Sequence, residues 1–354
     1  MTEFKQKERE LLTKLDRMHS EAINTYKYVH IAHNDKFVLP MIEFFRNFFD
    51  MKEHCFIYYG GVDKKTFPIP NYDNVFEIFD INNITFGDGI DKIICNGLFN
   101  TKLVTYLYAH NNLLNKAYWI IWGGDLYEFY RCHISDFVRR NMRACGDGLN
   151  DAKSYRRILN KDNKFFPIKF ISPITLNDIQ SVVKEEKDYV QIQINNSAHY
   201  STIEVLHNLF HFREQNIRIY TILSYGQREY AELIINVGKS FFGDKFFALT
   251  QYMQPEKYIT HLANNDILIL NHSRQQGMTS AHTSFLLGKK IFTRDVVKKD
   301  LRREGYRPES TEHIMGLSFD QLCSNPHAEE NMQAAKCRFD DNHIRDLWAN
   351  LFDA

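Results

Sequence analysis

The segment at residues 266–280, DILILNHSRQQGMTS, constrains the fold of this chain more than any other part of the sequence. Its apolar run predicts a short strand, and after a polar turn Gly277 opens a segment with the pattern of a helix. Proteins with α/β folds build anion sites in this way, because the free N–H groups and the dipole of a first helical turn attract negative charge. Arg274 would add a fork of hydrogen-bond donors for a phosphate. The alternative interpretation is a capped helix after an edge strand, with Arg274 on the surface.

Strand, polar turn and helix follow one another along most of the chain. The short apolar runs that we expect to form strands are residues 28–32, 56–59, 93–95, 119–122, 189–194, 219–223, 246–249, 267–270 and 290–293. This alternation predicts doubly wound α/β domains, and 354 residues are enough for two of them. We therefore expect an N-terminal helical extension at residues 1–26, Rossmann-like domains at 27–165 and 188–335, a linker at 166–187 and a C-terminal helix at 336–354.

The composition narrows the class of protein. The 44 basic and 44 acidic side chains cancel, which argues against a nucleic-acid binder held by its overall charge. The six cysteines show no metal-ligand spacing, and the first residues lack the apolar core of a signal peptide. No apolar run approaches the roughly 18 residues that span a bilayer. We expect a cytoplasmic protein with reduced cysteines, whose contact with a membrane would be peripheral, at the inner face of the plasma membrane.

Two polar turns in the first half could present catalytic side chains. The turn HNDK, with His33 and Asp35, follows the first expected strand, at the strand end where open α/β sheets place ligands. A second turn, Gly123-Gly124, brings Asp125 to the end of another strand. Asp125 also stands where a helix needs a capping residue, so its position alone favours a structural role.

The motifs of several other enzyme classes are missing from the sequence. The histidines have no cysteine or carboxylate partners at ligand spacing, and there is no GxSxG, GxxxxGK[ST] or GxGxxG motif. An NAD enzyme or an ATPase would therefore lack its usual glycines. Two Rossmann-like domains that face each other across a cleft, with polar turns at their strand ends, are the architecture of GT-B glycosyltransferases. In that architecture the second domain holds a nucleotide sugar, and the first presents the acceptor and a base.

Three short motifs add a resemblance to a known family. They are WGGDLYE at residues 122–128, the NNS turn with the following serine at 195–201, and RQQG at 274–277 after an apolar strand. In order and spacing they resemble glycosyltransferase family 56, the enterobacterial common antigen fucosaminyltransferases, over roughly residues 28–293. The resemblance implies a GT-B enzyme without a structural metal, at the cytoplasmic face of the inner membrane. It further implies transfer of 4-acetamido-4,6-dideoxy-D-galactose from a TDP conjugate to lipid II, a polyprenyl-diphosphate-linked disaccharide. Residues 1–26 and 139–166 depart from the family pattern.

We therefore predict a metal-independent glycosyltransferase of the hexosyltransferase type, with no cofactor beyond its nucleotide-sugar substrate. Its acceptor would be a lipid-linked or other glycan in bacterial surface polysaccharide synthesis. The residues expected at the donor are Asn196, Ser197, Tyr225, Gly226, Arg274, Gln275, Gln276, Gly277 and Thr279. For the base that takes the acceptor proton we expect Asp35 first, Asp125 second and His33 third. The alternatives are a GT-B enzyme with another donor or a protein acceptor, and a non-catalytic protein that binds a sugar nucleotide.

Overall fold

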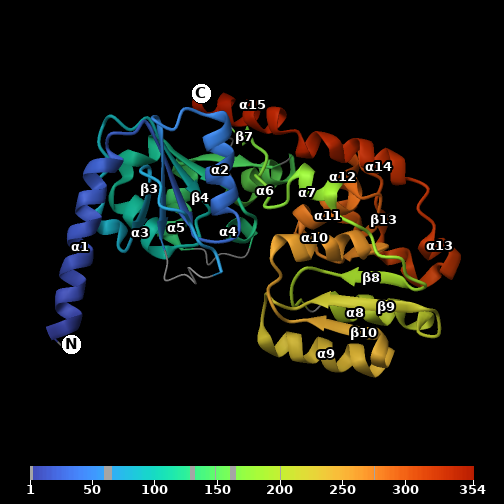
Figure 1. Cartoon of the computed structure of the whole chain (residues 1–354). Helices are drawn as coiled ribbons and strands as arrows, with labels where there is room; N and C mark the ends of the chain where they lie inside the picture. The colour runs from blue at the N-terminus through green and yellow to red at the C-terminus, as the bar shows by residue number, and fades with distance from the viewer. Residues whose placement is uncertain are drawn as a thin grey trace. The chain divides into compact units, whose positions relative to one another are not determined.

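The computed structural model describes residues 3–59, 66–127, 132–147, 149–159, 165–199, 201–274 and 276–354. It divides the chain into two compact units, each built on its own parallel sheet (Figure 1). Unit 1 consists of Met1–Pro173 together with Asp341–Ala354, and unit 2 is Ile174–Asp340. No helix in the described ranges is long and apolar enough to cross a membrane.

The sheet of unit 1 is doubly wound. Its described strands are β1 (Tyr28–His33), β2 (His54–Tyr59), β3 (Val75–Ile78), β4 (Lys92–Asn96), β5 (Ala117–Ile120), β6 (Arg143–Gly146) and β7 (Phe165–Pro167). They pair in parallel in the order β3-β2-β1-β4-β5-β6-β7. The direction of winding therefore reverses between β1 and β4, and open α/β sheets bind ligands at such a switch point.

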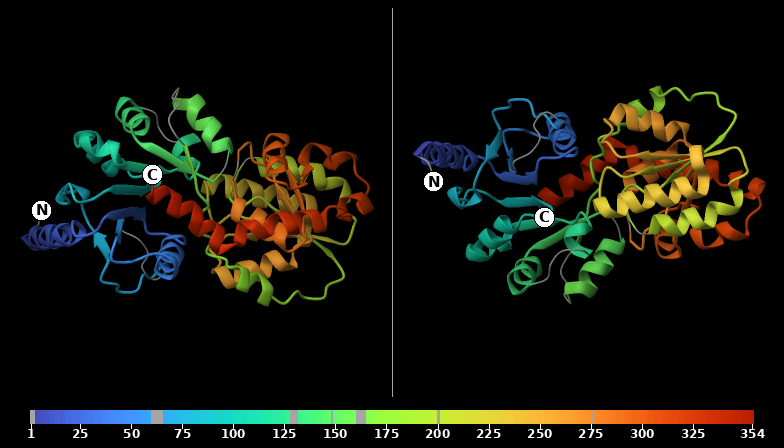
Figure 2. Two further views of the ribbon diagram at one scale, coloured as in Figure 1. Left: turned by 90° about the horizontal axis from the view of Figure 1, so that it is seen from above. Right: turned by 90° about the horizontal axis from the view of Figure 1, so that it is seen from below.

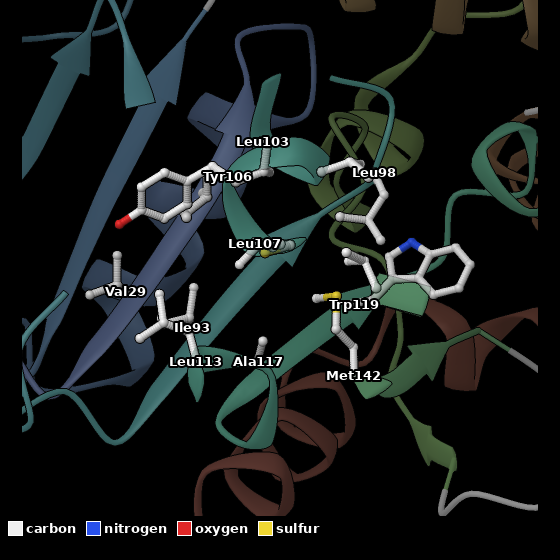
Figure 3. Close-up of a cluster of buried hydrophobic side chains, with 14 of the residues drawn as sticks. Val29, Ile93, Leu98, Leu103, Tyr106, Leu107, Leu113, Ala117, Trp119 and Met142 are labelled. Atoms are coloured by element: carbon white, nitrogen blue, oxygen red, sulfur yellow. The ribbon is translucent and has the colours of Figure 1, made fainter. Parts of the chain in front are cut away.

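Both faces of this sheet are covered. The helices of unit 1 are α1 (Glu3–Ile23), α2 (Val38–Phe48), α3 (Thr101–Ala109), α4 (Gly124–Tyr127), α5 (His133–Asn141), α6 (Leu149–Leu159) and α15 (Asp341–Phe352), with 3-10 helices at Ile81–Asn83 and Asn111–Asn115. Side chains alternate between two apolar clusters along each strand, so that Ile93 and Trp119 enter one cluster (Figure 3) while Ile94 and Tyr118 enter the other. Strands buried on both faces are the reason that these segments appear in the sequence as continuous apolar runs.

The last helix, α15, belongs to unit 1. Trp348 and Phe352 of α15 pack edge to face against Phe45 of α2 at ring-centroid distances of 5.3 and 5.9 Å. Figure 2 shows the end of the chain among the elements of unit 1. The segment at 336–354, which the sequence predicts as one C-terminal helix, is thus divided between the units. The expected linker at 166–187 contains the end of β7 and the helix α7 (Leu176–Ser181), and the boundary falls after Pro173.

Unit 2 repeats the same architecture. Its described strands are β8 (Val190–Ile194), β9 (Ile217–Ile222), β10 (Phe246–Leu249), β11 (Ile267–Leu270), β12 (Lys290–Thr293) and β13 (Glu309–Ser310), in the parallel order β10-β9-β8-β11-β12-β13. Its other helices are α8 (Ser201–Leu209), α9 (Arg228–Phe242), α10 (Pro255–Asn264), α11 (Met278–Leu286), α12 (Asp295–Arg303), α13 (Phe319–Cys323) and α14 (Ala328–Lys336), with 3-10 helices at Phe210–Phe212, Gly243–Lys245, Thr311–Gly316 and Cys337–Phe339. Here the winding reverses between β8 and β11, and a second switch point results.

A buried pair of histidines makes the stability of unit 1 dependent on pH. His30 Nε2 lies 3.1 Å from His54 Nδ1, among aromatic rings of α2 and α15. Burial lowers the pKa of His54 to about 4 and that of His30 well below its usual value. The unfolded chain binds protons at both side chains near pH 6.5, whereas in the folded unit His54 does so only near pH 4 and His30 only well below its usual pKa. The stabilisation is therefore complete above pH 6.5 and is lost as the pH falls toward 4.

We expect the free energy of unfolding of unit 1 to fall between pH 6.5 and 4 by about 1.4 kcal/mol per pH unit for each such histidine. Urea unfolding followed by tryptophan fluorescence at several pH values measures this slope. His54→Gln removes one titrating group and should make the slope shallower by about one proton. An identical slope in the variant would contradict the assignment.

Candidate functional site

Asn195 joins the two strand ends at the switch point of unit 2. It directly follows β8, is buried, and has the left-handed φ of 51° that asparagine tolerates better than most residues. Its Oδ1 accepts a hydrogen bond of 2.8 Å from the backbone N–H of Asn271, which follows β11. Its Nδ2 donates to Thr202 Oγ1 at 2.8 Å, at the start of α8. Asn195 thereby fixes the turn after β8 against the turn after β11.

Gly277 brings the N-terminus of α11 against Asn196. Gly277 is the N-cap residue of α11, with φ +70°, and a Cβ at this position would lie 2.5 Å from Asn196 Oδ1. Asn196 Nδ2 donates to Ser280 Oγ at 2.6 Å, in the first turn of the same helix, and to Tyr258 Oη at 3.1 Å. No side chain of the described residues caps α11. Only glycine permits the backbone at residue 277 to lie so close to Asn196, so the first turn of α11 begins directly beside the Asn196 side chain.

Two further contacts place other residues expected at the donor beside the start of α11. Gln276 Nε2 donates to Ser197 Oγ at 3.1 Å. The N–H of Ala198 donates to the carbonyl of Tyr225 at 2.7 Å. Gly226 has φ +102°, and a Cβ there would lie 2.5 Å from the Ala198 carbonyl oxygen, so both the backbone angle and the close approach require glycine. The turns after β8, β9 and β11 therefore form one surface. Thr279 lies in the first turn of α11, and Gln275 lies outside the described residues.

The sequence patterns did not point to His272, which lies beside this surface. Its side chain is only 2% exposed, and neither ring nitrogen has a hydrogen-bond partner among the described residues. Burial, then the nearby charges of His199, Arg274 and Arg294, lower its pKa to about 3, so the imidazole is neutral. Buried polar atoms without a partner are rare in folded proteins, and each one costs stability. His272 is therefore a candidate for contact with a ligand, next to the half-buried Arg274.

The switch point of unit 1 contains a cavity of about 320 Å³. Its polar lining residues are His33 and Asp35, which belong to the end of β1 and the turn after it, and Asn96 at the end of β4. Its aromatic lining residues are Phe37, Phe99, Trp122, Phe170 and Trp348. The remaining lining residues are Ala32, Val38, Met41 and Ile171. Two of the residues expected as a base thus line the same cavity.

The surroundings of Asp35 raise the pKa of its carboxyl group. Its Oδ1 accepts a hydrogen bond of 2.8 Å from the N–H of Phe37. Burial raises the pKa of Asp35, and this effect outweighs the Phe37 hydrogen bond and the charges of Lys36 and His33, which act in the opposite direction. A raised pKa makes a carboxylate a better proton acceptor near neutral pH. Asp35 can therefore take a proton from a hydroxyl group in the cavity.

Asp125 has a different environment. It is fully buried and is not one of the residues that line the cavity. Its carboxylate accepts hydrogen bonds from Trp119 Nε1 at 2.6 Å, from the N–H of Trp122 at 3.0 Å and from the N–H of Leu98 at 3.1 Å. These bonds tie the turn after β4 to the turn after β5. The geometry therefore favours a structural role for Asp125, but not the helix cap that the sequence suggested. Asp125 lies within α4 rather than before it, and none of its three hydrogen-bond donors belongs to α4.

The described residues contain no group of three or more histidine, cysteine or acidic side chains that could hold a metal ion. The polar groups gathered at the switch point of unit 2 are instead backbone N–H groups, amides, several hydroxyls, an imidazole and a guanidinium. These groups suit an anionic or hydroxylated organic ligand.

No protein-family model matches the chain, and no curated protein sequence matches it. Solved structures do match. A glycosyltransferase from Rickettsia africae ESF-5 aligns over 93% of this chain and 97% of its own, with a TM-score of 0.63 and 9% identity. HepE from Anabaena, in complex with UDP and glucose, aligns over 93% and 99%, with a TM-score of 0.65 and 10% identity. An O-GlcNAc transferase mutant from Thermobaculum terrenum aligns over 97% and 72%, with a TM-score of 0.59 and 10% identity.

These likenesses extend over both units, each with a parallel sheet whose winding reverses once. The fold class expected from the alternating strands and helices is therefore confirmed. The chain has the GT-B fold of glycosyltransferases.

Proposed function

We propose that this protein is a glycosyltransferase that holds the diphosphate of a nucleotide-sugar donor at the N-terminus of α11. One observation carries the proposal: α11 begins at the switch point between β8 and β11, at a left-handed glycine packed on Asn196, and no described side chain caps it. The N–H groups and the dipole of such a helix start attract phosphate. Arg274 adds a positive charge, and His272 adds a neutral hydrogen-bonding ring that has no hydrogen-bond partner among the described residues.

The proposed reaction depends on stabilising the negative charge that develops on the leaving diphosphate. The bond between the anomeric carbon and the diphosphate oxygen breaks, its electron pair stays on the diphosphate, and the added negative charge is stabilised by the start of α11 and Arg274. An acceptor hydroxyl oxygen forms the new bond to the anomeric carbon. In an inverting transfer its proton passes to a base. Asp35 is the proposed base, and His33, which lines the same cavity, is the alternative.

Asn196, Ser197, Gln276 and Thr279 would contact the diphosphate or the sugar in this scheme, and Tyr225 with Gly226 the nucleoside. The proximity of the three turns after β8, β9 and β11 supports this assignment. Asp125 takes no part in the reaction, because its carboxylate already accepts three hydrogen bonds inside unit 1.

We base the identity of the nucleotide, the sugar and the acceptor on the three sequence motifs. The resemblance to glycosyltransferase family 56 suggests TDP as the nucleotide, a deoxyamino sugar as the transferred group and a lipid-linked glycan as the acceptor. It also suggests a role in bacterial surface polysaccharide synthesis, with peripheral contact to the inner membrane surface. Glu128 and Gln275, which belong to two of the motifs, lie outside the described residues.

Calorimetric titration with TDP, UDP and GDP, and with the corresponding monophosphates, tests the donor site. We expect the diphosphates to bind more tightly than the monophosphates, and TDP to bind most tightly. Incubation with the matching nucleotide sugar then distinguishes an enzyme from a binding protein. An enzyme releases free nucleoside diphosphate in the presence of an acceptor, and a binding protein releases none.

Transfer should persist in excess EDTA. The proposed site stabilises the leaving diphosphate with a helix dipole, backbone N–H groups and a guanidinium, so a divalent cation is not needed for that charge. The measurement compares transfer rates after chelation and after the addition of manganese or magnesium. Complete loss of transfer, restored by either metal, would contradict the mechanism.

Gly277→Ala should weaken binding of the nucleoside diphosphate at least about tenfold. An alanine in the left-handed region costs roughly 1–2 kcal/mol, and its Cβ would displace Asn196 from the start of α11. Gly316→Ala is the matched control in unit 2, because no heavy atom lies within 4 Å of its added Cβ. Equal affinities of the two variants would show that the start of α11 does not contact the nucleotide.

A further inference from the structure

The cavity of unit 1 has a chemical character that defines what it can bind. Among its described lining residues, only His33, Asp35 and Asn96 are polar, and none is a lysine or an arginine. The parallel register pairs Ala32 of β1 with Asn96 of β4, so the three polar residues come from adjacent strand ends. The volume of about 320 Å³ lies at the lower end of the range for small-molecule sites. The cavity thus suits one or two rings, or a short acyl chain.

The aromatic walls are held in place by the fold. Trp122 stacks on Phe170 at a centroid distance of 4.6 Å, and Phe37 packs against Trp122 at 4.7 Å. Gly97 has φ +84°, and a Cβ there would lie 2.9 Å from the ring of Phe99 and 3.2 Å from that of Trp122. The glycine therefore lets both rings lie close over the end of β4. The result is a preformed apolar surface that loses little freedom when it binds a ligand.

Part of this surface is exposed to solvent. Phe99, a lining residue, is 51% exposed. An apolar group that covers it removes apolar area from water, and this is the main favourable contribution to binding in such a cavity. A ring with hydroxyl groups on all sides would instead lose hydrogen bonds to water along these walls without replacement.

We propose that the cavity binds the acceptor through an uncharged apolar group whose hydroxyl lies at Asp35, and that it rejects anionic or hydroxyl-rich groups. A hydroxyl can donate a hydrogen bond to the Asp35 carboxylate, whereas a phosphate or carboxylate would be repelled by it. Any phosphate of the acceptor therefore lies outside the cavity. This inference rests on the proposed function, because it concerns the acceptor of the same reaction. It replaces the glycan acceptor that the resemblance to glycosyltransferase family 56 suggests with an acceptor whose reacting hydroxyl is carried by an apolar group.

Three ligands with the same six-membered ring test the inference on the full-length protein. Cyclohexylmethanol carries one hydroxyl, cyclohexanecarboxylate carries a negative charge, and myo-inositol carries a hydroxyl on every ring carbon. Trp122 and Trp348 line the cavity, so tryptophan fluorescence reports binding, and none of the three ligands absorbs with tryptophan. We expect a saturable change with cyclohexylmethanol, at least about tenfold weaker binding of the carboxylate, and no binding of inositol.

Variants locate the binding in the cavity. Phe99→Ala should weaken binding of cyclohexylmethanol about tenfold, because it removes a large part of the exposed apolar wall. Phe79→Ala is the matched control, since Phe79 is a similarly exposed phenylalanine of unit 1 outside the lining. Asp35→Asn removes the repulsion and should bring the affinity for the carboxylate close to that for the alcohol.

The outcomes separate this inference from the proposed function. Inositol or the carboxylate binding as tightly as the alcohol in the unmodified protein would overturn the inference, as would an unchanged affinity in Phe99→Ala. TDP titrated into the same samples tests the donor site independently. If TDP binds and the alcohol does not, the acceptor class is wrong and the donor site stands. If the alcohol binds and no nucleoside diphosphate does, the proposed function fails and the cavity is not an acceptor site.

Discussion

Asp35→Asn should lower the rate of sugar transfer by about 10²-fold or more while leaving donor binding nearly unchanged. The amide keeps the shape of the side chain and can still accept the hydrogen bond from the N–H of Phe37, but it cannot take a proton. Single-turnover kinetics with a saturating nucleotide sugar isolate the chemical step, and calorimetry measures donor affinity separately. Because burial raises the pKa of Asp35, the rate should also fall as the pH drops below that pKa.

Two aspartates serve as controls for this experiment. Asp88→Asn, at an exposed position of unit 1, should leave the rate unchanged. Asp125→Asn should lower the thermal stability of unit 1 more than the rate, because the amide replaces a carboxylate that accepts three hydrogen bonds. If Asp125→Asn abolishes transfer in a folded protein while Asp35→Asn is nearly normal, their roles are reversed. If neither matters, a retaining mechanism without a carboxylate base becomes the better explanation.

Arg274→Ala should weaken binding of the nucleoside diphosphate by about 1.5–3 kcal/mol, which corresponds to roughly ten- to hundredfold in affinity. Arg274 lies in the turn that leads to α11, and its positive charge helps to lower the pKa of the buried His272. Arg274→Lys keeps the charge but loses the planar fork, so it should recover only part of the affinity.

Arg228→Ala is the matched control for Arg274→Ala. Its side chain is 89% exposed on α9, where it pairs with Glu232, and its removal should leave nucleotide binding unchanged. The loss in Arg274→Ala should be larger for diphosphates than for nucleosides, because the guanidinium acts on phosphate charge. Equal affinities of the Arg274 and Arg228 variants would remove Arg274 from the donor site.

The central strands could be predicted from the sequence. Strand β11 is buried on both faces, so all four of its residues are apolar and the run is visible without any tertiary information. In β8 and β9 isoleucines alternate with other residues, among them Gln191, Gln193 and Arg218, and this period of two also indicates a strand. Strands β3, β6, β7 and β13 were not predicted. They are two to four residues long, and they contain charged residues, glycine or proline, so no periodic pattern distinguishes them from loops.

The positions of the polar turns could also be predicted, because the carboxyl ends of parallel strands gather at one edge of a sheet. The turns after β8 and β11 do meet there, and the structure supplies the reason for Gly277, which is the proximity of Asn196. The environments of single side chains could not be predicted. Asp125 and His272 both follow apolar strands in the sequence, yet one carboxylate accepts three hydrogen bonds and one imidazole has none among the described residues.

The sequence by itself determined the class of fold, the approximate strands and the turns that carry polar groups. Tertiary structure decided that α15 returns to unit 1 and that Trp348 and Phe170 complete a cavity begun by Asp35 and Phe37. Apolar residues that recur in the sequence with the period of a helix or a strand indicate which side of that element is buried. These patterns do not indicate which distant segments pack together, and the burial and charge around a side chain depend on that packing.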